Sequence, residues 1–154
     1  MNNSVLIRPA EIKDIPRLLE LYLELAITRA TIKLKQIPSL EDYQGTFAEI
    51  QKIPWYRLLV VEFQGEIAGT SVLLIIPNLA QKNCPWALVE HLIIDPKYQR
   101  RKLGKMLIEH AMAVAKKAGC YKIVVSSNKK RRGAHKFYRA LGFEASSHGF
   151  SIYF

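Results

Sequence analysis

The most constraining feature of the chain is a junction between a strand and a helix in its second half. An apolar run typical of a buried strand, Ala87–Ile94, ends at Asp95-Pro96. A short basic segment follows, and a helical pattern of apolar residues begins at Leu103. The first N–H groups of a helix lack partners within the helix, and the helix dipole places partial positive charge there. This arrangement predicts an anion-binding site.

The residue types around this junction fit the same prediction. Gly104 lets the backbone come close to a ligand. Four cations surround the helix start: Arg100, Arg101, Lys102 and Lys105. The expected ligand is a phosphate or pyrophosphate. A solvated basic turn explains the spacing about equally well, because short glycine motifs often match by chance.

The positive charge of the chain is concentrated around the junction. The net charge is +10, and residues 97–139 hold 14 of the 23 Lys and Arg residues but only one acidic residue, Glu109. A polyanionic cofactor would explain this concentration, and so would nucleic acid. Charge alone does not choose between the two.

Two short motifs resemble a known family. Gln99-x-x-Lys102-x-Gly104 resembles the Q/R-x-x-G-x-G/A signature of the GCN5-related N-acetyltransferases. The block His135–Phe143 resembles the F-Y-x-x-x-G-F block of that family. Gly119–Ile123 and the ending Ser151–Phe154 resemble small-amine acetyltransferases, such as those for glucosamine 6-phosphate or aminoalkylphosphonates. In one departure, Lys102 stands where the signature usually has its first glycine.

The order of the elements indicates an α/β fold, with a mixed sheet and helices packed on it. The resemblance further implies that the sheet is mostly antiparallel and that its strands splay. We expect strands at residues 5–8, 57–63, 67–76, 87–94, 121–127, 143–145 and 150–154. We expect helices at residues 11–27, from an N-cap at Ser39 to about Lys52, and at residues 103–118 and 132–141. Residues 77–86 are the longest clear loop, and residues 1–154 are expected to form a single domain.

The composition predicts a globular protein of the cytoplasm. No apolar run approaches the roughly 18 residues of a membrane span, and the first residues do not resemble a secretory signal. The two cysteines, Cys84 and Cys120, are expected to be reduced thiols. The four histidines lack paired ligand spacing, so no metal site is predicted.

The resemblance implies acetyl-CoA as the co-substrate and indicates which residues bind it. Backbone N–H groups of the basic loop would bind the pyrophosphate, and the backbone of residues 92–94 would bind the pantetheine arm and thioester. The expected cofactor-binding residues are Leu92, Ile93, Ile94, Gln99, Arg100, Arg101, Lys102, Leu103, Gly104, Lys105, Asn128 and Tyr138. Leu92 and Ile94 could equally be core residues. The Asn128 amide could equally cap a turn.

Tyr138 is the candidate general acid. The resemblance places it close to the departing thiolate, and a phenol with a pKa near 10 suits protonation of a thiolate with a pKa near 8.5. From the residues alone, packing of Phe137 and Tyr138 with Ala134 and Leu141 in the core is the favoured interpretation. The resemblance reverses that preference.

Glu90 is the candidate general base, acting directly or through water. In a regular strand it shares a face with Leu92 and Ile94, although a bulge would break that relation. A salt bridge is an equally ordinary reason for a carboxylate on this strand.

These observations predict an acetyl-CoA-dependent N-acetyltransferase that acts on a primary amine of a small molecule by direct attack. Arg131 and Arg132 could hold an acidic acceptor, although a solvated helix start is the default interpretation of such a run. The acceptor is expected to be a small amine that could be acidic or phosphorylated. The alternatives are acetylation of a protein or peptide, a basic nucleic-acid-binding module, and a coenzyme-A-binding domain without catalysis. No membrane partner is expected, and the final strand would allow a homodimer if it lies at a sheet edge.

Overall fold

The computed structural model describes residues 4–26 and 37–152, apart from the side chains of residues 24–26. The chain forms two compact units, Met1–Val124 and Val125–Phe154. Ile27, the expected end of the first helix, lies outside the described residues, as do Tyr153 and Phe154 of the expected final strand. Because the chain forms two compact units, the expected single domain of residues 1–154 stays a prediction.

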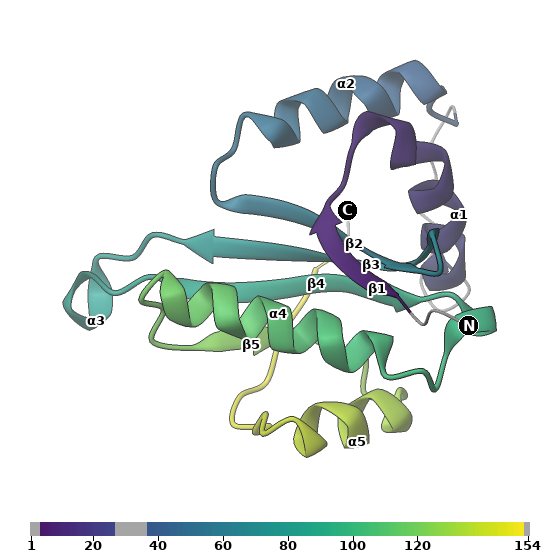
Figure 1. The fold of residues 1–154 in the computed structure, drawn as a ribbon. Helices are drawn as coiled ribbons and strands as arrows, with labels where there is room; N and C mark the ends of the chain where they lie inside the picture. Colours follow the sequence, from purple (N-terminus) through teal and green to yellow (C-terminus); the bar gives the residue numbers. More distant parts are fainter. Residues whose placement is uncertain (1–3, 27–36, 153–154) are drawn as a thin grey trace. The chain divides into compact units, whose positions relative to one another are not determined.

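A five-stranded sheet runs through the first unit (Figure 1). Its strands, in spatial order, are β1 (Val5–Pro9), β2 (Tyr56–Phe63), β3 (Glu66–Ile76), β4 (Trp86–Ile94) and β5 (Ile123–Val125). The first four pair antiparallel. β5 follows β4 after a helical crossover, which is the connection that parallel neighbours need. The predicted mixed sheet is confirmed, while the splay of its strands stays a prediction.

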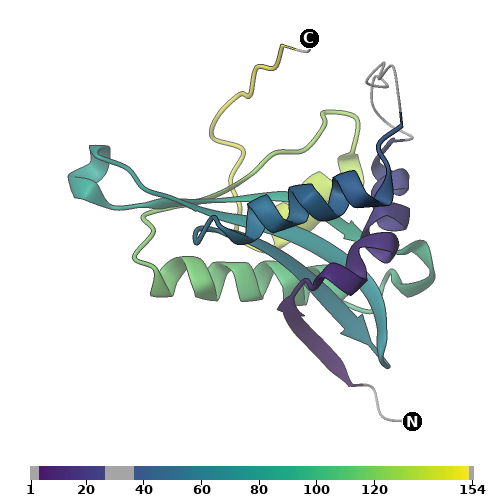
Figure 2. The ribbon, with the colours of Figure 1, turned by 90° about the horizontal axis from the view of Figure 1, so that it is seen from above.

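The helices of this unit cover both faces of the sheet, with α1 (Ile15–Ala26) and α2 (Leu40–Gln51) on one face and α4 (Leu103–Lys117) on the other (Figures 1 and 2). A short 3-10 turn, η1 (Ile12–Asp14), precedes α1. The predicted N-cap of α2 is confirmed, because Ser39 and Asp42 form a reciprocal capping box.

Two sets of buried side chains hold the layers together. On the α1 and α2 face, the core is formed by Ala10, Ile15, Leu18, Phe47 and Val60. On the other face, α4 buries the stripe Leu103, Leu107, Ile108, Ala111 and Ala115. Burying each of the larger side chains contributes about 1.5–3 kcal/mol. The helix predicted at residues 103–118 therefore forms as α4, and Gly119 follows its C-cap residue Ala118 at φ +74°, a conformation that favours glycine.

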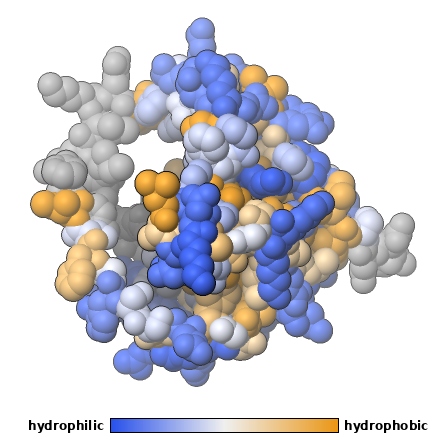
Figure 3. Space-filling view, turned by 90° about the vertical axis from the view of Figure 1, so that its left-hand side faces the viewer, coloured by the Kyte–Doolittle hydropathy of each residue, from blue (hydrophilic) through white to orange (hydrophobic). Residues whose placement is uncertain are grey.

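The connection between β3 and β4 is more ordered than the predicted loop. It contains α3 (Ala80–Asn83), in which Gln81, Lys82 and Asn83 all have left-handed backbone. The Asn78 amide holds this turn by donating to the carbonyls of Ala80 and Cys84. Figure 3 looks onto the end of the sheet near α3, where hydrophilic side chains separate several hydrophobic ones.

The second unit contains α5 (Arg132–Ala140), which ends as predicted before Gly142 at φ +88°. The expected strands at residues 143–145 and 150–154 are wrong for every residue of theirs that the structure describes. A strand needs a paired neighbour for its backbone groups. Phe150 and Ile152 are instead 96% and 77% exposed. The expected strand at residues 121–127 is shortened to β5.

Candidate functional site

β4 carries a bulge at His91. Glu90 pairs with Val72 of β3 and Ile93 pairs with Thr70, so two residues of β4, His91 and Leu92, lie opposite one residue of β3. His91 takes a left-handed conformation with φ +51°. The extra residue reverses the alternation of side chains beyond it.

The bulge corrects the expected environment of Glu90. Thr70 and Val72 lie two residues apart on β3 and so share a sheet face. Their partners Ile93 and Glu90 therefore share that face as well. The prediction that Glu90 shares a face with Leu92 and Ile94 is wrong, because the bulge turns those two residues to the opposite face. Glu90 is half-buried there.

Glu90 lies on the face covered by α1. Tyr22 of α1 is partly buried, and its hydroxyl forms a hydrogen bond with the side chain of Thr70. Burial, and then the proximity of Tyr56, raise the pKa of Tyr22 to about 12, against the opposing effect of the Thr70 hydrogen bond. The His91 ring packs edge-to-face on Tyr22 with ring centroids 5.9 Å apart. The neutral Tyr22 phenol therefore lies beside the bulge.

The end of β4 packs closely on Gly69 of β3. A Cβ atom at Gly69 would lie 2.5 Å from both the Ile93 carbonyl oxygen and the Ile94 Cδ1 atom. Any other residue would displace the end of β4, which is the segment expected to bind the thioester. Ser71, opposite the bulge, has a buried Oγ without a hydrogen-bond partner among the described residues.

The loop after β4 has an unusual backbone. Asp95 Oδ1 accepts from the Lys97 N–H at 2.7 Å and starts the 3-10 turn η2 (Pro96–Tyr98). Arg100 and Lys102 then take left-handed conformations with φ +63° and +65°. Left-handed residues within a turn direct successive N–H groups into a concave nest that suits an anion.

The N-terminus of α4 adjoins this nest. Lys102 is its N-cap residue, and no side chain caps the helix there. The first N–H groups of α4 are therefore available to a ligand. Lys102 adopts the left-handed backbone that the usual glycine of the signature would adopt freely, at a cost of roughly 1–2 kcal/mol.

The four cations of the loop are not equivalent. The Arg101 guanidinium lies over the Phe63 ring at 5.1 Å, and Lys105 Nζ pairs with Glu109 at 3.6 Å. Neither Arg100 nor Lys102 forms an ion pair with another residue that the structure describes. Arg100 and Lys102 are therefore the cations most available to an anionic ligand.

The second unit holds the remaining two predicted residues. Asn128 Oδ1 accepts from the Lys130 N–H at 2.9 Å, and the Asn128 carbonyl lies 3.0 Å from His135 Nε2. The side-chain oxygen of Asn128 thus shapes a turn, and binding of the coenzyme by Asn128 stays a prediction. The Tyr138 ring packs edge-to-face on Phe137 and Phe143, with centroids 5.2 and 5.7 Å apart.

The comparison with known proteins gives the family. Residues 18–143 match the acetyltransferase (GNAT) family. The chain belongs to this family. It is therefore an acyltransferase, and the resemblance given by the two motifs is confirmed.

Relatives of this GNAT chain include glucosamine 6-phosphate N-acetyltransferases. One from Trypanosoma brucei brucei is 33% identical over 81 residues, which span about half of each chain (53%). One from Arabidopsis thaliana is 27% identical over 100% of this chain and 99% of its own length. Among solved structures, a transcriptional regulator from Bacillus halodurans C-125 superposes with a TM-score of 0.87 at 28% identity, over 98% of this chain and 100% of its own.

Within this GNAT fold, the structure brings residues 90–105 together in one unit and places Asn128 and Tyr138 in the other. The sequence did not single out His91, Gly69 or Arg17, an α1 residue that contacts Asp95. A lone glycine in a strand pattern was the available signal for Gly69. The part of the chain that the structure describes contains no cluster of metal-ligating side chains and no helix able to span a membrane.

Proposed function

We propose that this GNAT chain transfers the acetyl group of acetyl-CoA to a primary amine of a small molecule. The observation that carries the proposal is the nest at Arg100–Lys102, directly before the uncapped N-terminus of α4 and after a bulged strand. That arrangement suits a pyrophosphate held by backbone donors, with a thioester lying along the end of β4.

Different residues of the first unit bind different parts of the coenzyme. The N–H groups of Arg100 to Lys105 bind the pyrophosphate, while Arg100 and Lys102 supply charge. The backbone of Leu92–Ile94, which begins within the bulge, binds the pantetheine arm and polarises the thioester carbonyl. Gln99 contributes by holding the loop to β4, because its Nε2 donates to the Ile94 carbonyl at 3.3 Å.

The reaction is a direct displacement. The amine nitrogen attacks the thioester carbon, the new C–N bond forms, and the C–S bond breaks. Glu90 accepts the proton that the amine loses, directly or through water, and Tyr138 donates a proton to the departing thiolate. Acyl transfer of this kind needs no covalent enzyme intermediate.

An acceptor that carries a phosphate or phosphonate is the substrate class that we favour. An aminoalkylphosphonate N-acetyltransferase from Salmonella typhimurium is 32% identical over 97 residues, and two other relatives are named for glucosamine 6-phosphate. Arg131 and Arg132 are exposed and supply the cations for such a group. The cytoplasm remains the proposed location, since Cys84 and Cys120 are both free. A homodimer remains a proposal as well.

The test is an amine panel with acetyl-CoA in which thiol release is followed. Glucosamine 6-phosphate and 2-aminoethylphosphonate are each compared with a matched amine lacking the anion, glucosamine and propylamine. Faster release with the anionic member of each pair supports the proposal. Coenzyme A binding without release from a broad panel would instead indicate a binding domain. Binding of DNA with a steep salt dependence would indicate a nucleic-acid module.

A further inference from the structure

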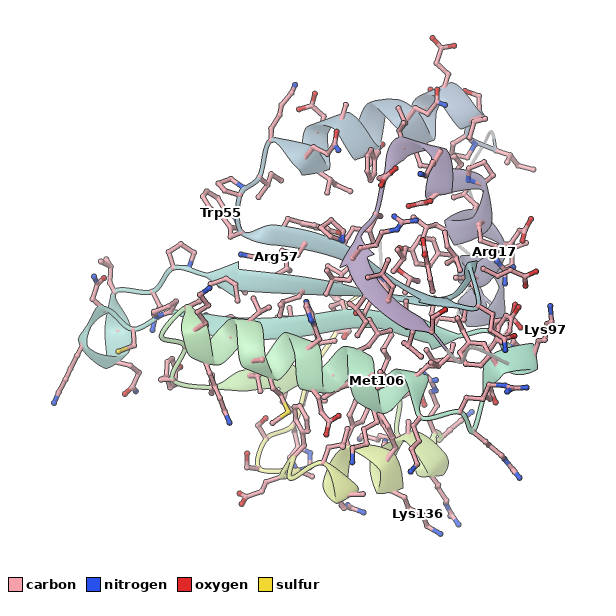
Figure 4. All side chains as sticks on the ribbon, viewed as in Figure 1. Arg17, Trp55, Arg57, Lys97, Met106 and Lys136 are labelled. Carbon is pink, nitrogen blue, oxygen red and sulfur yellow. The ribbon has the colours of Figure 1, made fainter. Side chains whose placement is uncertain are left out.

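Arg17 connects α1 to the beginning of the coenzyme loop. Its three guanidinium nitrogens have three different partners: Nε donates to the Ile67 carbonyl at 3.2 Å, Nη1 to Glu20 at 2.7 Å, and Nη2 to Asp95. The Arg17 side chain is 33% exposed and that of Asp95 is 18% exposed. Figure 4 shows Arg17 and Lys97 at the same end of the sheet. A lysine could not reproduce this fork of contacts.

Asp95 uses its two carboxylate oxygens for two different tasks. Oδ2 accepts from Arg17, while Oδ1 accepts from the Lys97 N–H and starts the turn that leads into the loop. Burial raises the pKa of Asp95, but the Arg17 hydrogen bond and the Lys97 N–H outweigh it and hold the pKa below its usual value. The carboxylate is therefore charged wherever the protein is folded near neutral pH.

The middle of the loop, residues 98–101, contacts the hairpin of β2 and β3. Tyr98 is buried, its hydroxyl donates to Glu66, and its ring lies 5.9 Å from that of Phe63. Arg101 covers the same Phe63 ring. The hairpin of β2 and β3 therefore supports residues 98–101, whereas α1 supports residue 95. The strained left-handed residues of the loop, Arg100 and Lys102, depend on such support.

α1 touches the proposed coenzyme site at two points. Arg17 holds Asp95 at the entrance of the pyrophosphate loop. Tyr22, one to two turns further along the same helix, contacts His91 at the bulge where the thioester would lie. A structural change at the Arg17–Asp95 contact can thus be transmitted through α1 to the Tyr22–His91 contact, and the reverse.

We infer that Arg17 is a positioning residue that couples the pyrophosphate loop to α1, so that coenzyme binding at the loop stabilises α1 and its Tyr22 beside the bulge. The inference rests on the proposed function. By linkage, the effect is reciprocal: an intact Arg17–Asp95 pair tightens coenzyme binding, and bound coenzyme protects α1.

The test uses the full chain with coenzyme A as the probe, in calorimetric titration. Arg17→Met removes the charge but keeps much of the aliphatic stem. Asp95→Asn keeps an acceptor for the Lys97 N–H. Each should weaken coenzyme A binding about tenfold, and the double variant should be no weaker than either single one, because both remove one interaction. Glu20→Gln, which removes another Arg17 contact, is the matched control and should bind like the wild type.

Hydrogen exchange separates coupling from simple stabilisation. In the wild type, saturating coenzyme A should slow amide exchange in both α1 and the loop. In Arg17→Met, it should slow exchange in the loop alone. A purely structural Arg17 would lower protection equally with and without coenzyme. Wild-type affinity in Arg17→Met, or retained protection of α1, would overturn the inference alone. A wild type that does not bind coenzyme A would overturn the proposed function and the inference together.

Discussion

The pyrophosphate loop and the segment around Tyr138 are built in opposite ways. The loop, residues 95–104, lies among side chains that are distant in sequence: Arg17 contacts it across 78 residues and Glu66 across 32. The Tyr138 ring packs on Phe137 and Phe143, one and five residues away. The loop's shape is therefore imposed by the fold, whereas these two ring contacts of Tyr138 come from residues close to it in sequence.

This difference separates the two tasks of the proposed enzyme. A binding loop with strained residues needs support from several elements, because its own sequence does not favour its conformation. A proton donor needs only a hydroxyl at the right place, and its ring can be held by residues that are close to it in sequence. Substitutions in the loop should therefore change coenzyme affinity, and substitution of Tyr138 should change turnover.

The largest expected effect is on turnover. Tyr138→Phe keeps the ring that packs on Phe137 and Phe143 and removes only the hydroxyl. If this hydroxyl protonates the thiolate, kcat should fall roughly 100-fold or more while coenzyme A binding stays nearly unchanged. Steady-state kinetics and calorimetry measure the two quantities. An acyl donor with a more acidic thiol should show a smaller loss. Wild-type turnover on acetyl-CoA would exclude the role.

Glu90→Gln tests the other proton transfer, which lies in the first unit. The wild-type rate should rise with pH from neutral to mildly alkaline values, because the amine must lose its proton before attack. The variant should lose up to about 100-fold in kcat near neutral pH, with coenzyme binding retained. The loss should shrink as the pH rises, because more of the amine is then already deprotonated. An unchanged pH profile in a folded variant would assign Glu90 a structural role.

The sequence predicts the features that depend on nearby residues better than those that depend on contacts between distant segments. Periodicity and capping residues predicted α4 and α2, because both signals act within a few residues. The bulge at His91 was not predicted, since a bulge is a relation between two strands and no local residue type marks it. The expected strands at residues 143–145 and 150–154 failed for a similar reason: their residue types favour extended backbone, but the described residues there have no paired strand.

The candidate site was predictable only in part. The motif around Gly104 indicated which residues form the loop, and the left-handed backbone at Arg100 and Lys102 fits that prediction. The contacts that hold the loop, from Arg17 and Phe63, depend on tertiary structure and have no sequence signal. The roles of Glu90 and Tyr138 stay predictions until the substitutions are made.

A smaller effect, on coenzyme A affinity, is expected from a substitution that blocks the backbone N–H groups of the loop. Gly104→Val places a β-branched side chain in the first turn of α4, where the anion is expected to approach. It should weaken coenzyme A binding about tenfold or more, which corresponds to ~1.4 kcal/mol. Arg101→Ala should have less effect, because that guanidinium already lies over Phe63 and is solvent-exposed. Calorimetric titration of both variants decides between backbone and side-chain binding. Equal affinities of the wild type and Gly104→Val would contradict the backbone mechanism.

The smallest expected effect is on the free energy of unfolding. It tests whether the backbone of the loop is strained at Lys102. Lys102 has φ +65°, a conformation that costs a lysine roughly 1–2 kcal/mol but costs a glycine little. A glycine also loses more chain entropy on folding, by about 0.5–1 kcal/mol, so the two effects partly cancel. Lys102→Gly should therefore raise the free energy of unfolding by about 1 kcal/mol or less in a denaturant titration. The matched control is Lys105→Gly, which removes the same charge from a residue inside α4 and should destabilise the protein by about 1 kcal/mol. If both glycines destabilised equally, Lys102 would carry no strain, and the loop would not depend on its neighbours in the way that distinguishes it from the Tyr138 segment.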